Sequence, residues 1–487
     1  MNARPNIIFL MTDQQRWDAL GAVNPVVKTP ALDALARQGI RFTQAVCQAP
    51  MCIPSRNAMM TGLYASQTGI RWNEDPVYDE RTFPVDPIPE MLRKAGYQTA
   101  GFGKTHWGRL PYGAPVSTRG FEVRYVGARE VGLEDGATVY QDDDDPEGLA
   151  AYRREVAAYN DGEENLAGYI GCTSEVDAKC HRDGWVAEKC FEFLENGIDS
   201  SRPLFLYLSF LKPHAGFNIP GGFESLYDIA DIPDMALPPW DRESGTHIAA
   251  LERHGKDRGW LYSLHNYESW RAGFSAMTPL QRRTTLLRYY ANCSWLDSYL
   301  GKALDMLRAR GVLDNALIVF ASDHGDMLGE RHYRFSKFNL FESSVRVPMI
   351  LGGSVVEKAK HGTIDDRCVG LIDLYDTLQR VAGGRPSPIP NGIDLLNPNA
   401  MRDGAFCELH EGGFPAYMWR TRDFKLILFP GPATGDMACG ELYDLRKDPN
   451  EWRNVYDDKD YAPHRERMKA ELIAHLGRMG CTTNRTG

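Results

Sequence analysis

Polar side chains follow four apolar runs of the 487-residue chain, each at the point where a run ends. They are Asp13 and Gln14, then Lys104 and His106, then His214, and finally Asp323 and His324. A single polar residue at a strand end is usually a cap or a turn former. A set of them at the ends of strands of one sheet is harder to explain that way, because the carboxyl ends of parallel strands meet at one edge. Carboxylate and amide oxygens with one imidazole suit a divalent cation, so the sequence indicates a metal site.

Cys52 stands in the stretch Ala49–Gly62, APMCIPSRNAMMTG, shortly before Arg56. A helix that begins near Pro54–Ser55 would direct its free backbone N–H groups at residue 52, and Arg56 adds a fixed positive charge. These surroundings favour an anionic nucleophile at position 52. Two other interpretations are a buried structural cysteine, which most free cysteines are, and a plain thiolate nucleophile, for which no His–Asn pair marks a cysteine hydrolase.

The elements that must position these residues follow from hydrophobic periodicity. Helices are predicted at Thr29–Gly39, with Thr29 as cap, and at about Thr284–Arg310. Buried strands are predicted at Asn6–Met11, Thr99–Gly103, Leu204–Phe210 and Leu317–Ala321. This alternation predicts an α/β fold with a large mixed, mostly parallel sheet and helices on both faces. Val123–Lys179 and Ala215–Thr278 lack clear periodicity, and we interpret them as insertions around the sheet edge.

The C-terminal part of the chain has a different pattern. Proline and asparagine cluster near Arg385–Asn399, as in a linker. Beyond it, AYMWRTRDFKLILF and GELYDLRKDP resemble antiparallel strands, and a helix is predicted at Tyr461–Arg478. The sequence therefore predicts a catalytic domain over residues 1–400 and a smaller α+β subdomain with an antiparallel sheet over 401–487.

Composition excludes several classes of protein. The formal net charge of −10 disfavours nucleic acid or an anionic membrane as the main partner, although a local positive site for a small anion is compatible with it. None of the ten cysteines forms a CxxC pair, so the sequence has neither a zinc ribbon nor a thioredoxin motif. The apolar run Ile7–Met11 is too short for a signal peptide or a membrane span. We therefore expect a cytoplasmic protein with reduced thiols.

The motif Cys52–Arg56, CIPSR, followed by MMTG, resembles the signature of the type I sulfatases, which belong to the alkaline phosphatase superfamily. The resemblance continues through the polar residues described above, through Lys337, and through ELYDLRKDPNEWRNV at Glu441–Val455. It implies that a formylglycine-generating enzyme oxidises Cys52 to Cα-formylglycine, whose hydrate is the nucleophile. It also implies hydrolysis of a sulfate monoester, which is either an aryl sulfate or an alkyl or carbohydrate sulfate.

The same resemblance implies a role for each site residue. One divalent metal ion is expected on Asp13, Gln14, Cys52, Asp323 and His324. Lys104, Lys337 and His214 are expected to neutralise the sulfate oxygens, with His214 also protonating the leaving alcohol. His106 is expected to deprotonate the second hydroxyl of the hydrate, and Arg56 to support that hydrate.

Two positions depart from the pattern of many sulfatases. Many members have a second aspartate where this chain has Gln14, and asparagine where it has His324. The same pair occurs in the related phosphonate monoester hydrolases, which resemble manganese enzymes. We therefore expect Ca²⁺ with Mn²⁺ as the alternative, and a phosphonate monoester or phosphodiester hydrolase as the alternative activity. The intact Cys52, Lys104, His106 and His214 argue against a third interpretation, a non-catalytic metal-binding relative. A homo-oligomer is compatible with the sequence.

Overall fold

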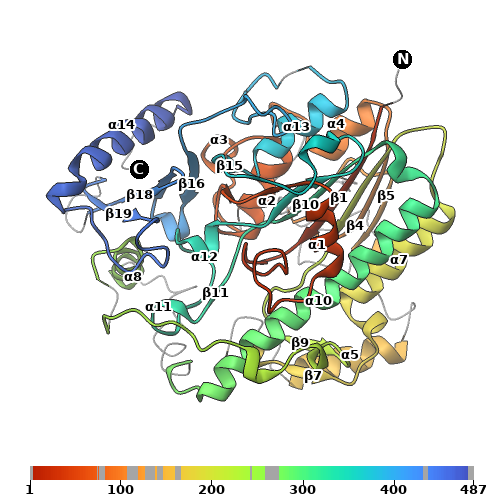
Figure 1. The fold of residues 1–487 in the computed structure, drawn as a ribbon, viewed down its shortest axis with the longest axis horizontal. Helices are drawn as coiled ribbons and strands as arrows, with labels where there is room; N and C mark the ends of the chain where they lie inside the picture. The colour runs from red at the N-terminus through yellow and green to blue at the C-terminus, as the bar shows by residue number, and fades with distance from the viewer. Residues whose placement is uncertain are drawn as a thin grey trace.

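Figure 1 shows the protein as a computed structural model. It describes residues 4–73, 75, 83–106, 119–126, 138–139, 146–158, 166–241, 244–257, 274–385, 387–431 and 437–480. Within these residues no helix is both long enough and apolar enough to cross a membrane.

A large sheet forms the centre of the described structure. Its strands, in spatial order, are β14 (Thr363–Asp365), β2 (Ile40–Phe42), β13 (Met349–Gly352), β10 (Ala316–Ser322), β1 (Asn6–Thr12), β8 (Leu204–Ser209), β4 (Gln98–Gly103), β5 (Val123–Val126) and β6 (Thr138–Val139). Among them only β13 runs antiparallel to its neighbours. The central strand β1, NIIFLMT, is buried on both faces, as a continuous apolar run in a parallel sheet must be. The predicted mixed, mostly parallel sheet is confirmed.

Helices cover both faces of this sheet (Figure 1). On one face, α1 (Pro30–Arg37), α7 (Arg182–Asn196) and α10 (Pro279–Ala309) pack on Ile8 and Leu10 of β1. On the other face, α2 (Cys52–Thr61), α4 (Ile88–Lys94) and α13 (Asp373–Val381) pack on Ile7, Phe9 and Met11. Alternate residues of one strand thus contribute to two separate apolar layers, which hold the sheet rigid.

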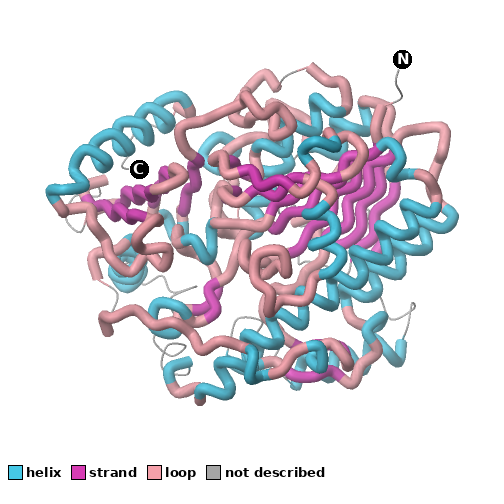
Figure 2. The backbone as a smooth tube through the Cα atoms, viewed as in Figure 1, coloured by secondary structure: helices cyan, strands magenta, loops and turns pink. Residues whose placement is uncertain are grey.

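A second, smaller sheet lies beside the first, with a helix against it (Figure 2). Its strands are β16 (Ala405–Leu409), β17 (Ala416–Arg420), β18 (Phe424–Phe429) and β19 (Cys439–Asp444), all antiparallel. Met468 and Leu472 of α14 (Ala462–Arg478) pack against Leu426 of β18. The predicted antiparallel sheet and terminal helix are confirmed, whereas the domain boundary at residue 400 stays a prediction.

The remaining α-helices and strands lie outside these two sheets. They are β3 (Ala45–Val46), α3 (Ala65–Thr68), α5 (Pro146–Ala158), α6 (Leu166–Ile170), β7 (Cys172–Ser174), β9 (Asn218–Pro220), α8 (His247–Asp257), β11 (Met327–Leu328), α11 (Glu330–Tyr333), β12 (Phe335–Ser336), α12 (Glu342–Val345) and β15 (Val369–Gly370). The interpretation of Val123–Lys179 as an insertion is wrong at its start, because β5 and β6 extend the main sheet. Strands of four and two residues are too short to show a period in the sequence.

Two predicted helix starts also need correction. Helix α2 begins at Cys52 rather than near Pro54, because proline is tolerated in a first turn, where its missing N–H has no helical partner. At α1, Thr29 occupies the cap position, but its hydroxyl makes no capping bond. The free N–H groups of Ala31 and Leu32 instead donate to the Asp297 carboxylate of α10, at 2.9 and 2.8 Å.

Candidate active site

The carboxyl ends of four adjacent parallel strands, β10, β1, β8 and β4, lie at one edge of the main sheet. Asp13 follows β1 directly, and Asp323 follows β10 directly, in the register that pairs Thr12 with Ser322. Lys104 directly follows β4, and His214 lies in the loop after β8. The rigid register of the sheet thus brings together residues that lie up to about 300 positions apart in sequence.

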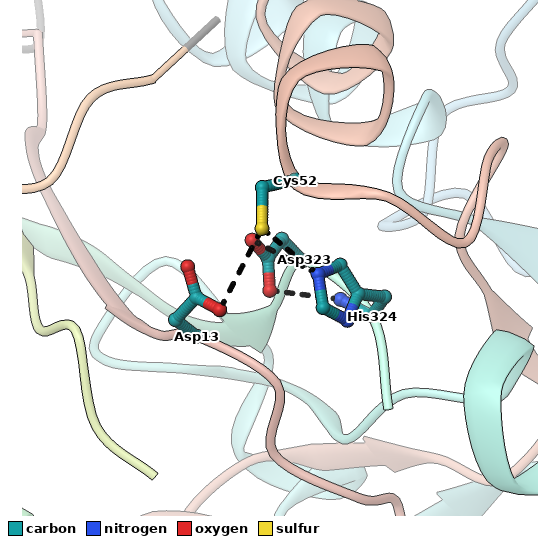
Figure 3. A group of neighbouring side chains, drawn as sticks. All are labelled: Asp13, Cys52, Asp323 and His324. Atoms are coloured by element: carbon teal, nitrogen blue, oxygen red, sulfur yellow. Dashed lines mark hydrogen bonds and ion pairs between the residues drawn. The ribbon is translucent and has the colours of Figure 1, made fainter. Parts of the chain in front are cut away.

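Four ligand-type side chains converge at this edge (Figure 3). Donor atoms of Asp13, Cys52, Asp323 and His324 all lie within 4.8 Å of one another, and all four residues are buried. Cys52 Sγ lies 3.9 Å from Asp13 Oδ1 and 3.2 Å from His324 Nε2. The first turn of α2 therefore points its side chain at the two strand ends.

Gln14 adds an amide to this group. Its backbone has a left-handed φ of 65°, and its N–H donates to Asp323 Oδ1 at 3.0 Å. The side-chain Oε1 accepts a hydrogen bond from Lys337 Nζ at 2.8 Å, and Nε2 is buried without a hydrogen-bond partner in the described part of the chain. Two carboxylates and an imidazole gathered around residue 52, with the amide of Gln14 on the residue after Asp13, fit the donor set of one divalent cation.

Arg56 bridges the carboxylates of Asp13 and Asp323. Its Nε donates to Asp323 Oδ2 at 2.7 Å, and its Nη2 donates to Asp13 Oδ2 at 3.2 Å. All three side chains are fully buried. A planar guanidinium with several fixed donors can hold two carboxylates at a set separation, so Arg56 orients both acids toward Cys52.

Two lysines contribute further positive charge. Lys104 Nζ lies 2.5 Å from Asp13 Oδ2, and Lys337 Nζ lies 2.7 Å from His214 Nε2. Arg56 and Lys104 contact the carboxylates of Asp13 and Asp323, and Lys337 adds a third positive charge beside His214 and Gln14. The local charge is therefore opposite in sign to the net charge of −10 of the whole chain, and it suits an anionic substrate.

The burial of the site changes its proton affinities. Burial, reinforced by the charge of Asp13, raises the pKa of the Cys52 thiol to about 12, so the unmodified side chain is a poor nucleophile here. Burial alone would raise the pKa of Asp13, but neighbouring positive charge, led by that of Lys104, holds it well below its usual range.

Two histidines lie outside the ligand group, His214 buried and His106 half-buried. Burial, followed by the charge of Lys104, lowers the pKa of His106 well below its usual range. Burial, followed by the charge of Lys337, does the same to the pKa of His214. A neutral imidazole accepts a proton, which suits a base and a hydrogen-bond acceptor.

Sequence reasoning missed the side chains that hold Arg56 and the strand ends. Arg56 Nη1 donates to Tyr207 Oη and Ser209 Oγ, at 3.2 and 3.0 Å. Ser55 Oγ donates to the Asp323 carbonyl at 2.5 Å, and Ser322 Oγ donates to the Thr12 carbonyl at 3.2 Å. Tyr207, Ser209 and Ser322 interrupt otherwise apolar strands, and this was the signal available in the sequence.

A family model described as Sulfatase matches residues 5–384. The chain belongs to the sulfatase family. A second family model, described as N-sulphoglucosamine sulphohydrolase, C-terminal, matches residues 329–477 of this sulfatase. The family hydrolyses sulfuric esters, and the assignment confirms the resemblance of CIPSR at Cys52–Arg56.

Known proteins resemble this sulfatase over nearly its whole length. The arylsulfatase of Clostridium perfringens is 26% identical, with 97% of this chain and 94% of that protein covered. The crystal structure of the phosphonate monoester hydrolase of Agrobacterium radiobacter has a TM-score of 0.75 at 24% identity, covering 98% and 96% of the two chains. The structure of BT4656 in complex with its substrate, D-glucosamine-2-N,6-O-disulfate, has a TM-score of 0.73 at 21% identity, covering 98% of each chain. At these identities the two structures establish the fold.

Proposed function

We propose that this sulfatase hydrolyses a sulfate monoester and that Cys52, converted to formylglycine, is the nucleophile. The substrate is an aryl sulfate or an alkyl or carbohydrate sulfate. The observation that carries the proposal is the position of Cys52 Sγ, 3.2 Å from His324 Nε2 and 3.9 Å from Asp13 Oδ1, at the first turn of α2. The sulfur stands in for a hydroxyl of the aldehyde hydrate. A hydroxyl oxygen there would lie among the metal-ligand candidates and beside Lys104 and Lys337.

The metal we propose is one divalent ion, Ca²⁺, with Mn²⁺ as the alternative. Asp13, Gln14, Asp323, His324 and residue 52 would hold it, and when bound it would acidify the nucleophilic hydroxyl and neutralise charge on the sulfate. Arg56 keeps the two carboxylates facing the same point. The imidazole of His324 and the amide of Gln14 replace harder oxygen donors, which favours Mn²⁺ more than an all-carboxylate site would.

The residues around this group supply proton transfer and charge. Lys104, Lys337 and His214 neutralise the oxygens of the sulfate group, as donors fixed in a site that is largely closed to water. The Lys337 ammonium donates to His214 Nε2, so this pair holds the proton that the leaving alcohol needs. His106, kept neutral by burial, serves as the base for the step that frees sulfate.

A phosphonate monoester or phosphodiester hydrolase is the second candidate, favoured by Gln14 and His324 at the metal site. The deciding experiment is kcat/KM for a matched aryl sulfate and aryl phosphonate, measured on the metal-loaded enzyme that carries formylglycine. We expect the sulfate to react faster. A large preference for the phosphonate would reverse the order of the two proposals.

The cell compartment and the maturation partner are also part of the proposal. The described cysteines are all free thiols, and all but Cys439 are buried. Free thiols suit a reducing compartment, and we propose the cytoplasm. A formylglycine-generating enzyme is the partner that the chemistry at Cys52 requires, and fractionation combined with peptide mass spectrometry would test both points.

A further inference from the structure

The segment that carries Lys337 has an unusual backbone. Ser336 and Phe338, on either side of the lysine, both have a left-handed φ of 69°. Residues other than glycine adopt this conformation at a cost, and a bulky side chain such as that of Phe338 adopts it rarely. Such a backbone persists only where the surrounding structure holds it, so contacts outside the segment must fix the position of Lys337.

Two contacts from distant elements meet at Leu340, three residues after Lys337. The N–H of Leu340 donates to His247 Nε2 at 2.9 Å. Its carbonyl accepts a hydrogen bond from Lys425 Nζ at 3.0 Å. The side chains of His247 and Lys425 are fully buried, and they come from α8 and from β18. Both backbone groups of Leu340 are thus held by side chains that lie far away in sequence.

Glu441 of β19 sets the orientation of His247. Its Oε1 lies 2.7 Å from His247 Nδ1 and accepts from the His247 backbone N–H at 2.5 Å, while Tyr443 Oη donates to Oε2. Since Nε2 accepts from Leu340, Nδ1 must carry the ring proton and donate it to the carboxylate. Glu441 therefore selects the tautomer that leaves Nε2 as an acceptor.

The backbone between Leu340 and Lys337 has little freedom of its own. The N–H of Phe338 donates to the Pro50 carbonyl at 3.2 Å, and Asn339 Nδ2 donates to the Lys337 carbonyl at 3.3 Å. The N–H of Phe341 donates to Asn339 Oδ1 at 3.2 Å. A displacement at Leu340 is therefore passed along a short, braced segment to the lysine.

We propose that His247 is a positioning residue for the reaction, oriented by Glu441, and that it acts by holding the backbone that presents Lys337 to His214 and Gln14. The inference rests on the proposed role of Lys337. A buried carboxylate and imidazole cost more to desolvate than an apolar pair of the same size, so filling space does not explain them. Fixing a strained backbone at a reacting group does, since small displacements there have large effects on rate.

Two substitutions at position 247 separate the two bonds of the imidazole. In His247→Asn the amide nitrogen can replace Nδ1 toward Glu441, but no acceptor reaches Leu340. In His247→Gln the amide oxygen can replace Nε2 and accept from Leu340. We expect kcat/KM to fall on the order of 10–100-fold in H247N and by less than about 5-fold in H247Q. Equal losses in both variants would overturn the proposal.

A double-mutant cycle tests whether the effect passes through Lys337. In a Lys337→Ala background, H247N should cost less than about 3-fold, because the lysine it positions is gone. A loss as large as in the wild-type background would contradict the proposal. His475→Asn is the matched control, since the His475 ring of α14 packs against Phe406 and Trp419 of the smaller sheet. It should lower thermal stability without changing kcat/KM.

The cycle is run with whichever of the aryl sulfate and the aryl phosphonate reacts faster, so failure of the sulfate assignment changes the substrate and leaves the cycle intact. Affinity for inorganic sulfate, measured by calorimetry on the metal-loaded enzyme, is a second readout that needs no turnover. H247N and Lys337→Ala should weaken it non-additively, and additive losses would overturn the proposal. If H247N fails to fold, Glu441→Gln is the alternative variant, because it keeps the shape of the side chain and weakens the acceptor for His247 Nδ1. The fall in kcat/KM caused by Glu441→Gln should likewise disappear in the Lys337→Ala background.

Discussion

The Nζ atom of Lys337 lies 2.7 Å from Nε2 of His214, with the lysine as donor and the imidazole as acceptor. Both side chains are buried, and the positive charge of Lys337, after burial itself, lowers the pKa of His214. The proton of this pair is therefore on the lysine before substrate binds. Proton delivery to a leaving alcohol is then a property of two residues rather than of His214 alone.

Removal of His214 should harm substrates with poor leaving groups most. For His214→Ala we expect a loss in kcat/KM of about 10-fold for a nitrophenyl sulfate and of about 10³-fold for an alkyl sulfate, because only the alkyl alcohol needs a proton to leave. The measurement is the slope of log kcat/KM against leaving-group pKa. Lys337→Met should steepen the slope similarly if the two residues share the proton. An even loss across the series would refute this assignment.

Removal of His106 should affect the other half-reaction. The release of sulfate needs a base, whereas the release of alcohol does not, so His106→Ala should release about one alcohol per active site rapidly and then turn over slowly. Stopped-flow absorbance with a nitrophenyl ester measures the burst. The His214→Ala variant is the comparison, since it slows the first step and should show no burst. Equal behaviour of the two variants would mean that both residues only hold the sulfate oxygens.

The metal site can be tested without any activity measurement. Asp13→Ala and Asp323→Ala should each abolish stoichiometric metal, because each removes one of the two carboxylates of the donor set. Elemental analysis should find one divalent ion, Ca²⁺ or Mn²⁺, per wild-type chain. Asp297→Asn is the matched control, a buried aspartate away from the site, and it should retain the metal. Zinc, or two ions at the site, would contradict the proposed donor set.

The burial of Cys52 constrains when it can be modified. Cys52 lies in the first turn of α2 and is only 2% exposed, so a modifying enzyme has no access to its side chain in the folded protein. We therefore expect a formylglycine-generating enzyme to convert a peptide of residues 49–62 and to leave the folded, unmodified protein unchanged. Conversion removes about 18 Da, which peptide mass spectrometry detects. Efficient conversion of the folded protein would show that this helix opens.

The sequence predicts the central part of the fold well because each long strand is a continuous apolar run. Asn6–Thr12 and Ala316–Ser322 are each recognisable alone, and the residues that follow them are the site residues. Strands such as Ile40–Phe42 and Thr363–Asp365 are too short to carry a period, and pairing with distant segments defines them. Thr29 occupies the cap position of α1 as predicted, but the side chain that accepts from the first N–H groups is Asp297, which lies 265 residues from Leu32 and could not be identified from local sequence.

That cap provides a stability test with a definite sign. Burial raises the pKa of Asp297 to about 7, above its unfolded value of about 3.9. The folded state then binds more protons than the unfolded state between these values, so this group's contribution is fully present below pH 4 and is lost as pH rises through 7. Wild type should lose up to about 1.4 kcal/mol per pH unit relative to Asp297→Asn between pH 5 and 7. Denaturant melts at several pH values measure it, and a difference independent of pH would contradict it.

The contact between His247 and Leu340 has a consequence for recombining family members. Exchanging residues 244–257 for those of another family member, in order to change the preferred alcohol, also removes His247, the side chain that holds the backbone next to Lys337. Since Lys337 acts on the sulfate group, the exchange affects every substrate. Chimaeras should therefore fold and bind metal yet lose turnover, unless residue 247 and its partner Glu441 are transferred together. Crossover points that keep His247 and Glu441 from the same parent should give active chimaeras, whereas a crossover at the boundary between the two sheets separates these two residues.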